Sequence, residues 1–381
     1  MANYSISPDW VSETQQQGWG TLITANNSST TSTSWFYGMK PLIDKSVQAG
    51  TTFSNGIVST YSLVYTLGGG NAGYWGGVLA PNGDVHFVPN SGVRGQKINV
   101  ITGLVSTYSL VYTQNNAYLG GVLAPNGDVH FIPNNAPRGQ KISSAGIVST
   151  YSLVYTAGTY IGGVLAPNGD IHFVPGSAPV GQKISAAGVV STYSLVYTIS
   201  NAYGGGVLAP NGDIHFIPYF ATVGQKIATI TGLVSTYSLV YAENGFVSIY
   251  FGGVLAPNGD IHFVPFSATV GQKISATGVV STYSLVITGF IGAGGVLAPN
   301  GDIHFVPLQP SASGQKISTV TGLVSTYSIV NTNAGFSSGV VFPNGDVHFI
   351  PSSASTGQKI STMPAIPFSS AISCSPFYNK L

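Results

Sequence analysis

Three residue types that often do chemistry in proteins recur at fixed positions along this chain of 381 residues. The motif Asp-x-His occurs seven times, and a Lys follows each motif at the end of a short variable stretch. Imidazole and carboxylate groups bind metals and carry protons, and Asp-x-His places both on one side of a strand. A ring of metal or proton-handling sites is therefore one hypothesis. The residues are Asp84, His86, Lys97, Asp128, His130, Lys141, Asp170, His172, Lys183, Asp213, His215, Lys226, Asp260, His262, Lys273, Asp302, His304, Lys316, Asp346, His348 and Lys359.

The alternative, a structural role for this repeated set, is the one we favour. Identical residues in every copy are expected when each copy contains the same buried hydrogen-bond network, and the recurring STYS segment offers partners for the histidines. A catalytic site needs asymmetry. Outside the repeated positions the only acids are Asp9, Glu13, Asp44 and Glu243, and no histidine remains. The sequence predicts no catalytic residue, no metal site and no cofactor.

The repeat itself determines the predicted architecture. Seven copies of one unit run from residue 56 to residue 360, each with a GxVSTYSLVYT-like segment, a GGVLAPNGD[VI]HF[VI]P-like segment and GQKI. The histidines are 42 to 47 residues apart, which is the length of a four-stranded propeller blade. No segment has a capped 3.6-residue period. We expect an all-β fold, a seven-bladed β-propeller.

The second copy illustrates the strands that position these residues. Gly120 to Ala124 and Val129 to Pro133 flank an Asn-Gly turn and form strands A and B of a hairpin. Gln140 to Ile142 is a short strand C, and Val148 to Thr156 is a longer strand D. Strand A is expected to be innermost, because its Gly-Gly pair, absent only from the last copy, allows seven backbones to approach one axis.

The order of the pieces predicts how the ring closes. The repeated region begins with a lone D strand, Ile57 to Thr66, and ends with an A-B-C set, Gly339 to Ile360. Pairing the first D strand with the last set removes both unpaired edges. A straight stack of blades is the competing arrangement, and it needs polar capping repeats that the sequence lacks.

Composition excludes several classes of partner. Only 6% of the residues are charged and the formal net charge is +1, so nothing attracts nucleic acid or an anionic membrane. No apolar run reaches 18 residues, and the first residues lack a secretory signal, so we expect a protein made in the cytoplasm without membrane insertion. Cys374 is the only cysteine, which excludes intrachain disulfides and Cys-rich zinc sites.

One face of the predicted disc varies between copies. The D-to-A and B-to-C loops, which emerge at one end of an up-and-down blade, differ in every copy, whereas the A-to-B turn is PNGD throughout. The variable end collects aromatic residues, which a glycan or protein partner would contact; packing against neighbouring loops is the alternative. The predicted binding residues are Tyr74, Trp75, Tyr118, Tyr160, Tyr203, Tyr219, Phe220, Tyr250 and Phe266, and Phe246, Phe251, Phe290 and Phe336 are nearby candidates.

Two segments lie outside the repeat. Residues 1–55 contain Trp10, Trp19 and Trp35, and we expect a docking arm anchored by these rings, with a flexible leader as the alternative. Residues 361–381 are predicted to be an extended C-terminal tail. The expected domains are thus 1–55, 56–360 and 361–381.

The motif YxGGVLAPNGDIHFVPxxAxxGQKI resembles a recurrent propeller repeat and is similar in strand order to NHL-type blades. The composition, poor in charge and rich in Gly, Ser, Thr, Asn and Tyr, with nearly identical tandem copies, resembles that of bacteriophage virion proteins of the head-decoration, fibre or tail-adhesin kind.

These observations lead to three functional hypotheses. The first is a non-enzymatic protein of the virion surface, attached to other virion proteins through its arm and contacting host glycans or neighbouring subunits through its variable face. The second is a carbohydrate-binding propeller lectin, and the third, weaker, is an enzyme that uses the central channel. The 55-residue arm favours the first, because a free lectin does not need it.

Overall fold

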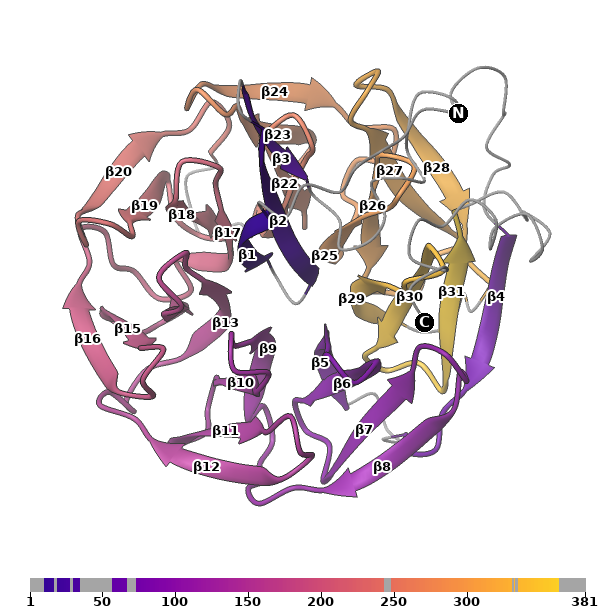
Figure 1. Cartoon of the computed structure of the whole chain (residues 1–381). Coiled ribbons are helices and arrows are strands. Elements are labelled where there is room, and N and C mark those ends of the chain that lie inside the picture. Colours follow the sequence, from indigo (N-terminus) through magenta and orange to yellow (C-terminus); the bar gives the residue numbers. More distant parts are fainter. Residues whose placement is uncertain are drawn as a thin grey trace.

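The computed structural model is a ring of seven four-stranded antiparallel sheets (Figure 1). It describes residues 10–16, 19–27, 30–34, 57–66, 73–242, 248–330, 332 and 335–362, and for the first three ranges only the backbone. The described residues form strands and turns without a helix. The predicted all-β class and the seven-bladed propeller are confirmed.

Each blade is a meander whose strands follow in chain order. The blades are β5 (Tyr74–Leu79), β6 (Asp84–Pro89), β7 (Arg94–Asn99), β8 (Val105–Ser109); β9 (Tyr118–Leu123), β10 (Val129–Pro133), β11 (Arg138–Ile142), β12 (Val148–Ser152); β13 (Tyr160–Leu165), β14 (Ile171–Pro175), β15 (Val180–Ile184), β16 (Val190–Ser194); β17 (Tyr203–Leu208), β18 (Asp213–Pro218), β19 (Val223–Ala228), β20 (Val234–Ser238); β21 (Tyr250–Leu255), β22 (Ile261–Pro265), β23 (Val270–Ile274), β24 (Val280–Ser284); β25 (Gly292–Leu297), β26 (Asp302–Pro307), β27 (Ser313–Ser318), β28 (Val324–Ser328); and β29 (Phe336–Val341), β30 (Asp346–Pro351), β31 (Thr356–Ser361), β4 (Ile57–Ser62). We number them blades 1 to 7 in this order.

Blade 7 contains the closure that the sequence predicted. Its outer strand is β4, from the beginning of the repeated region, and it pairs antiparallel with β31, from the end. Gly357 lies opposite Tyr61, and Ile360 lies opposite Val58. The pairing removes two unpaired edges and joins the ends of the repeat into one ring.

The inner strands approach each other closely, as the Gly-Gly pairs predicted. The first glycine of the pair packs tightly against the next blade at two junctions, and a Cβ on Gly205 would lie 2.7 Å from the Cα of Gly252. A Cβ on Gly120 would lie 2.9 Å from the Cα of Gly162. No side chain fits at these two contacts, and at Gly162, where there is space, a φ of 140° favours glycine instead.

The two ends of the disc differ in what they carry. We call the end with the seven PNGD turns, residues 81–84 and their equivalents, the turn face, and the opposite end, with the D-to-A and B-to-C loops, the loop face. Every turn glycine has a positive φ, between 81° and 86°, which explains the glycine. The turn amide Gly83 N–H donates to Ala80 O at 3.0 Å.

Strand D is shorter than predicted. In blade 2 it ends at Ser152 and not at Thr156. The following amides, Val154 N–H and Tyr155 N–H, leave the sheet and donate to Oε1 of Gln182 in blade 3, at 3.0 and 2.8 Å. A link between blades thus replaces the last part of the strand.

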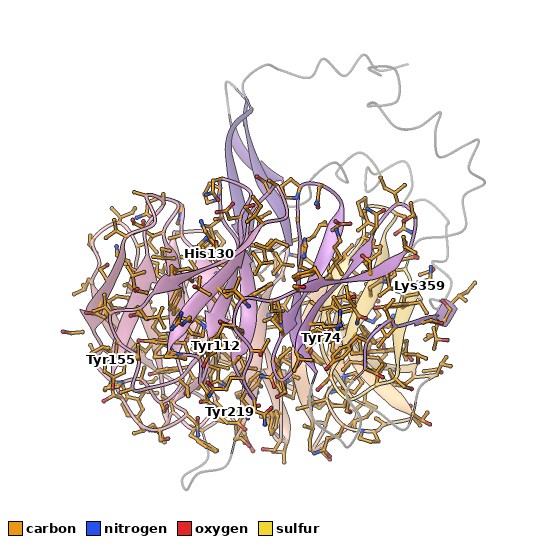
Figure 2. All side chains as sticks on the ribbon, turned by 90° about the horizontal axis from the view of Figure 1, so that it is seen from below. Tyr74, Tyr112, His130, Tyr155, Tyr219 and Lys359 are labelled. Carbon is orange, nitrogen blue, oxygen red and sulfur yellow. The ribbon has the colours of Figure 1, made fainter. Side chains whose placement is uncertain are left out.

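The N-terminal region contains a separate antiparallel sheet, formed by β1 (Trp10–Gln16), β2 (Trp19–Asn27) and β3 (Thr30–Ser34). This sheet lies over the middle of the ring in Figure 1, and in Figure 2 it rises from the side of the disc opposite Tyr219, which is the turn face. Among the residues that can be described, no helix is long and apolar enough to span a bilayer.

Candidate functional site

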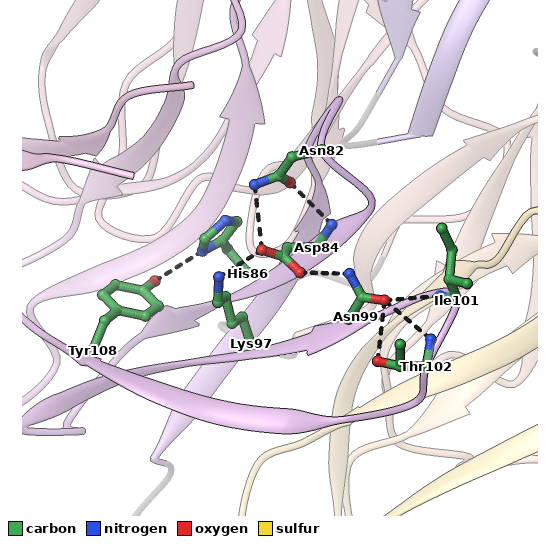
Figure 3. A network of polar contacts seen from close by, with 8 residues as sticks. All are labelled: Asn82, Asp84, His86, Lys97, Asn99, Ile101, Thr102 and Tyr108. Atoms are coloured by element: carbon green, nitrogen blue, oxygen red, sulfur yellow. Dashed lines mark hydrogen bonds and ion pairs between the residues drawn. The ribbon is translucent and has the colours of Figure 1, made fainter. Parts of the chain in front are cut away.

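The repeated polar residues form one network in each blade, shown for blade 1 in Figure 3. Lys97 Nζ lies 2.6 Å from Asp84 Oδ2, and the other six blades have the same ion pair at 2.6 to 2.8 Å. Asp84 N–H donates to Asn82 Oδ1 at 3.0 Å, so the turn and the ion pair are tied together. Burial by itself would raise the pKa of Asp84, but hydrogen bonds from Lys97 and Asn99 hold it below its usual value.

Each histidine packs against the tyrosine of its STYS strand. Ring centroids are 4.9 to 5.6 Å apart in all seven blades, and His86 Nδ1 is 3.3 Å from Tyr108 Oη. Burial and, to a smaller extent, the positive charge of Lys97 lower the pKa of His86 to about 4, against the opposing effect of Asp84. The imidazole is therefore neutral at pH 7. A neutral, buried ring with the same partner in every blade fits a structural role.

The tyrosine explains the glycine of the GQKI motif. In blade 2 the ring of Tyr151 covers Gly139 on the adjacent strand, and a Cβ at that position would overlap the ring. Equivalent tyrosines cover the glycine of every other blade. This cross-strand packing holds each ring against its histidine. The network leaves no cluster of three or more His, Cys, Asp or Glu residues able to hold a metal within the described ranges.

Five of the aromatic residues predicted to bind a partner are buried. These residues begin the inner strands, and their rings pack edge-on or tilted against the phenylalanine of strand B, as Tyr74 does with Phe87 at 5.6 Å. Tyr74 Oη donates to Arg94 O at 3.0 Å, which satisfies the hydroxyl inside the blade. Their expected exposure is therefore wrong: the exposed fractions are 2% for Tyr74, 0% for Tyr118, 1% for Tyr160, 0% for Tyr203 and 0% for Tyr250.

The other four predicted residues are partly exposed and form one cluster with Phe251 on the loop face. Tyr219 is central, with ring centroids 4.6 Å from Phe220 and 5.4 Å from both Phe251 and Phe266. Trp75 completes the cluster at 5.8 Å from Phe251. We call Trp75, Tyr219, Phe220, Phe251 and Phe266 the aromatic cluster.

The contact between Trp75 and Phe251 crosses the axis of the propeller. Trp75 is in β5, whose neighbours in the inner ring are β9 and β29, whereas Phe251 is in β21 of blade 5. Both occupy the second position of strand A. Smaller residues stand at this position in the other blades: Leu119, Ile161, Gly204, Ala293 and Ser337. The aromatic cluster is thus an asymmetric feature of an otherwise repeated ring.

Only part of the segment with the three tryptophans that are predicted to anchor the arm is described in the structure. Trp10 and Trp19 begin β1 and β2, so two of the three stand in the N-terminal sheet. Trp35, like Phe246 and the tail from residue 363, lies outside the described residues.

Two features of the repeat were not predicted from the sequence. The glutamine of GQKI is fully buried in every blade and binds two amides of the preceding blade, and its recurrence was the signal. Phe342 replaces the alanine of the other copies, and it packs on His348.

Comparisons with solved structures agree with the fold. The chain is similar to a streptogramin B lyase, with a TM-score of 0.69 and 19% identity over 82% of this chain and 99% of that one. A catalytically inactive virginiamycin B lyase from Staphylococcus aureus, with quinupristin, has a TM-score of 0.68 and 16% identity over 80% and 99% of the two chains. The WD40 β-propeller domain of Doa1 has a TM-score of 0.60 and 14% identity over 80% and 98%.

At these identities the similarity shows the seven-bladed propeller fold alone. No protein-family model matches the sequence. No curated protein matches it either.

Proposed function

We propose that the chain is a non-enzymatic structural protein of a virus particle, of the head-decoration, fibre or tail-associated kind found in bacteriophages. Its N-terminal arm attaches to other virion proteins, and its loop face contacts a host surface or a neighbouring subunit. The protein assembles in the host cytoplasm and acts at the virion surface without a cofactor.

The observation that carries this proposal is the division of the disc into two unlike faces. The turn face has the same PNGD turn in all seven blades, and the β1–β3 sheet rises from it (Figure 2). The loop face varies from blade to blade and holds the aromatic cluster. Two unlike faces are expected of a protein that is attached to a particle at one face and exposed to the surroundings at the other.

The ion pairs inside the blades support a structural role. Seven of the twelve Lys and Arg residues are paired with seven of the eleven Asp and Glu residues inside the blades. Few charges are then left to build a catalytic site. Closed sheets without a cofactor also suit a particle that persists outside the cell.

The aromatic cluster favours a second candidate, a carbohydrate-binding propeller. Partly exposed Trp, Tyr and Phe rings provide flat apolar area that stacks on sugar rings. A lectin with several equivalent sites would repeat its binding residues, whereas this cluster joins Trp75 of blade 1 to rings of blades 4 and 5. One glycan site on the loop face is compatible with both candidates.

Two variants separate attachment from recognition. Deletion of residues 1–55 is expected to remove the protein from purified particles while the propeller remains folded. Trp75→Ala combined with Phe251→Ala is expected to leave incorporation intact and to reduce binding of particles to host cells or to a glycan array. Val111→Ala on the outer rim is the control.

Cryo-electron microscopy of the particle measures the first effect directly. Density for residues 1–55 in contact with a capsid or tail protein is the expected result. A free monomer that binds glycans and is absent from particles would instead support the lectin.

A further inference from the structure

A surface cavity of about 270 Å³ lies between blades 1 and 2 on the turn face. Blade 1 contributes Ala80 and His86 to its walls, and blade 2 contributes Val129, Ile142 and Ser144. His86 is only 3% exposed but lines the cavity, so the cavity reaches a residue of the repeated network. Nothing in the proposed function uses this cavity, and it lies on the face opposite the aromatic cluster.

The junction between blades 7 and 1 has the same design, but a phenyl ring occupies the place of the methyl group. Phe342 stands where blade 1 has Ala80, and its ring stacks on His348 with centroids 3.5 Å apart and planes 3° apart. Phe342 is 2% exposed and belongs to the same apolar cluster as Val85 and Ile98. Val100 packs against that cluster.

The two junctions match residue by residue. His348 corresponds to His86, Val85 to Val129, Ile98 to Ile142, and Val100 to Ser144. The chain thus fills the junction after blade 7 with its own phenyl ring, whereas blades 1 to 6 have an alanine at this position, and the cavity described here lies beside Ala80 of blade 1.

We propose that the cavity beside His86 is a binding site for a small neutral aromatic molecule of the phenol class. The ring stacks on the imidazole of His86 as Phe342 stacks on His348, between the walls formed by Val129 and Ile142. Phe342 is the internal counterpart of this ligand.

The size of the cavity suits such a molecule. Apolar cavities of roughly 150 Å³ bind benzene, and drug-sized ligands need roughly 300 Å³ or more. A cavity of about 270 Å³ is between these limits. One ring with a small substituent is therefore the expected occupant.

The polar groups at the cavity favour a neutral ligand with a hydroxyl. Burial keeps His86, which lines the cavity, uncharged at pH 7, with a pKa of about 4, and the nearby Asp84 and Lys97, which do not line it, neutralise each other through their ion pair. Ser144 replaces the valine of the filled junction and offers a hydroxyl group. The residues at the same position in three other blades, Thr229, Thr319 and Thr362, donate to a turn carbonyl of their own blade.

Fluorine NMR of para-fluorophenol with the full chain tests the proposal. Binding on the order of 1 mM is expected for a ligand of this size, and it broadens the fluorine signal. Ala80→Phe, which copies blade 7 into blade 1, should sharpen the fluorine signal toward that of the free probe. The control Val111→Ala should bind as the natural chain does.

The reciprocal variant is Phe342→Ala. It should open a second cavity on His348, lower the melting temperature and bind a second equivalent of the probe, and the probe should recover part of the lost melting temperature. If this variant fails to fold, a crystal of the natural chain soaked in phenol tests whether the cavity beside His86 binds the ring. Density stacked on His86 supports the site, and its absence overturns it.

A competition experiment distinguishes a free aromatic molecule from the side chain of a partner protein. A tyrosine-containing tripeptide that competes with the probe indicates a partner's side chain, and competition by phenol alone indicates a free small molecule. Equal broadening by the natural chain and Ala80→Phe would mean that the probe binds elsewhere and would overturn the proposal. Neither result affects the proposed attachment and recognition roles, which concern the arm and the loop face.

Discussion

Oε1 of Gln96 accepts a hydrogen bond from the backbone N–H of Tyr65 at 2.8 Å, across the junction between blades 7 and 1. It also accepts from Val64 N–H at 3.1 Å. The glutamine of every other blade makes an equivalent contact with the chain that leaves the preceding blade. Seven buried side chains thus join seven sheets that share no backbone ladder.

Gln96→Ala should destabilise the ring measurably. The substitution leaves two amides without their acceptor, and each such loss costs about 1–3 kcal/mol when water cannot replace it. The free energy of unfolding, measured by urea denaturation, should fall by about 2–4 kcal/mol after partial solvent access is allowed for. Ser109→Ala, at an exposed position of strand D, is the control and should change little. An unchanged midpoint for Gln96→Ala would show that the junction does not depend on this link.

Removal of the closing strand should open the ring. A chain that begins at residue 67 lacks β4 and exposes the edge of β31, so we expect aggregation. A chain that begins at residue 56 retains β4 and is the matched control. Light scattering and thermal melting compare the two. The closure would be dispensable if both chains remained monomeric with the same melting temperature.

Gly139→Ala should displace the ring of Tyr151 and weaken its contact with His130. Overpacking of this kind costs about 1–3 kcal/mol. The same substitution in a Tyr151→Ser background should cost much less, because the covering ring is gone. A double-mutant cycle measures this coupling. Equal costs in both backgrounds would contradict the contact.

Acid should destabilise the protein in a range set by its histidines. Burial lowers the pKa of the histidines in blades 1 to 5 to about 4, below the usual value of about 6.5. The unfolded chain therefore binds more protons between these two values, so stability is complete above about pH 6.5 and is lost as the pH falls toward about 4. Each of these histidines lowers the free energy of unfolding by about 1.4 kcal/mol for every pH unit that the pH falls in that range.

Urea denaturation at several pH values measures this slope. His172→Gln removes one titrating group and should reduce the slope of the free energy of unfolding against pH by the contribution of one proton. A stability that stays constant down to about pH 4 would contradict the predicted role of the histidines, because only carboxylates would then titrate.

The repeat was sufficient to predict most of the fold. The spacing of the histidines gave the blade, PNGD gave the A-to-B turn, and the lone D strand at Ile57 gave the closure, because each depends on local chain geometry or on the need to pair an edge. The Gly-Gly pairs indicated the inner strand for the same reason. Sequence also predicted the partnership between the histidines and the STYS strand.

Only the tertiary structure decided which aromatic residues are accessible. Tyr118 is the first residue of the inner strand of blade 2, and Trp75 is the second residue of the inner strand of blade 1. The alternation of a strand sends the first ring into the blade and the second toward the axis. The contact of Trp75 with Phe251, and that of Phe342 with His348, depend on how closed sheets pack around an axis. Those distances follow from the whole ring, and no single repeat contains them.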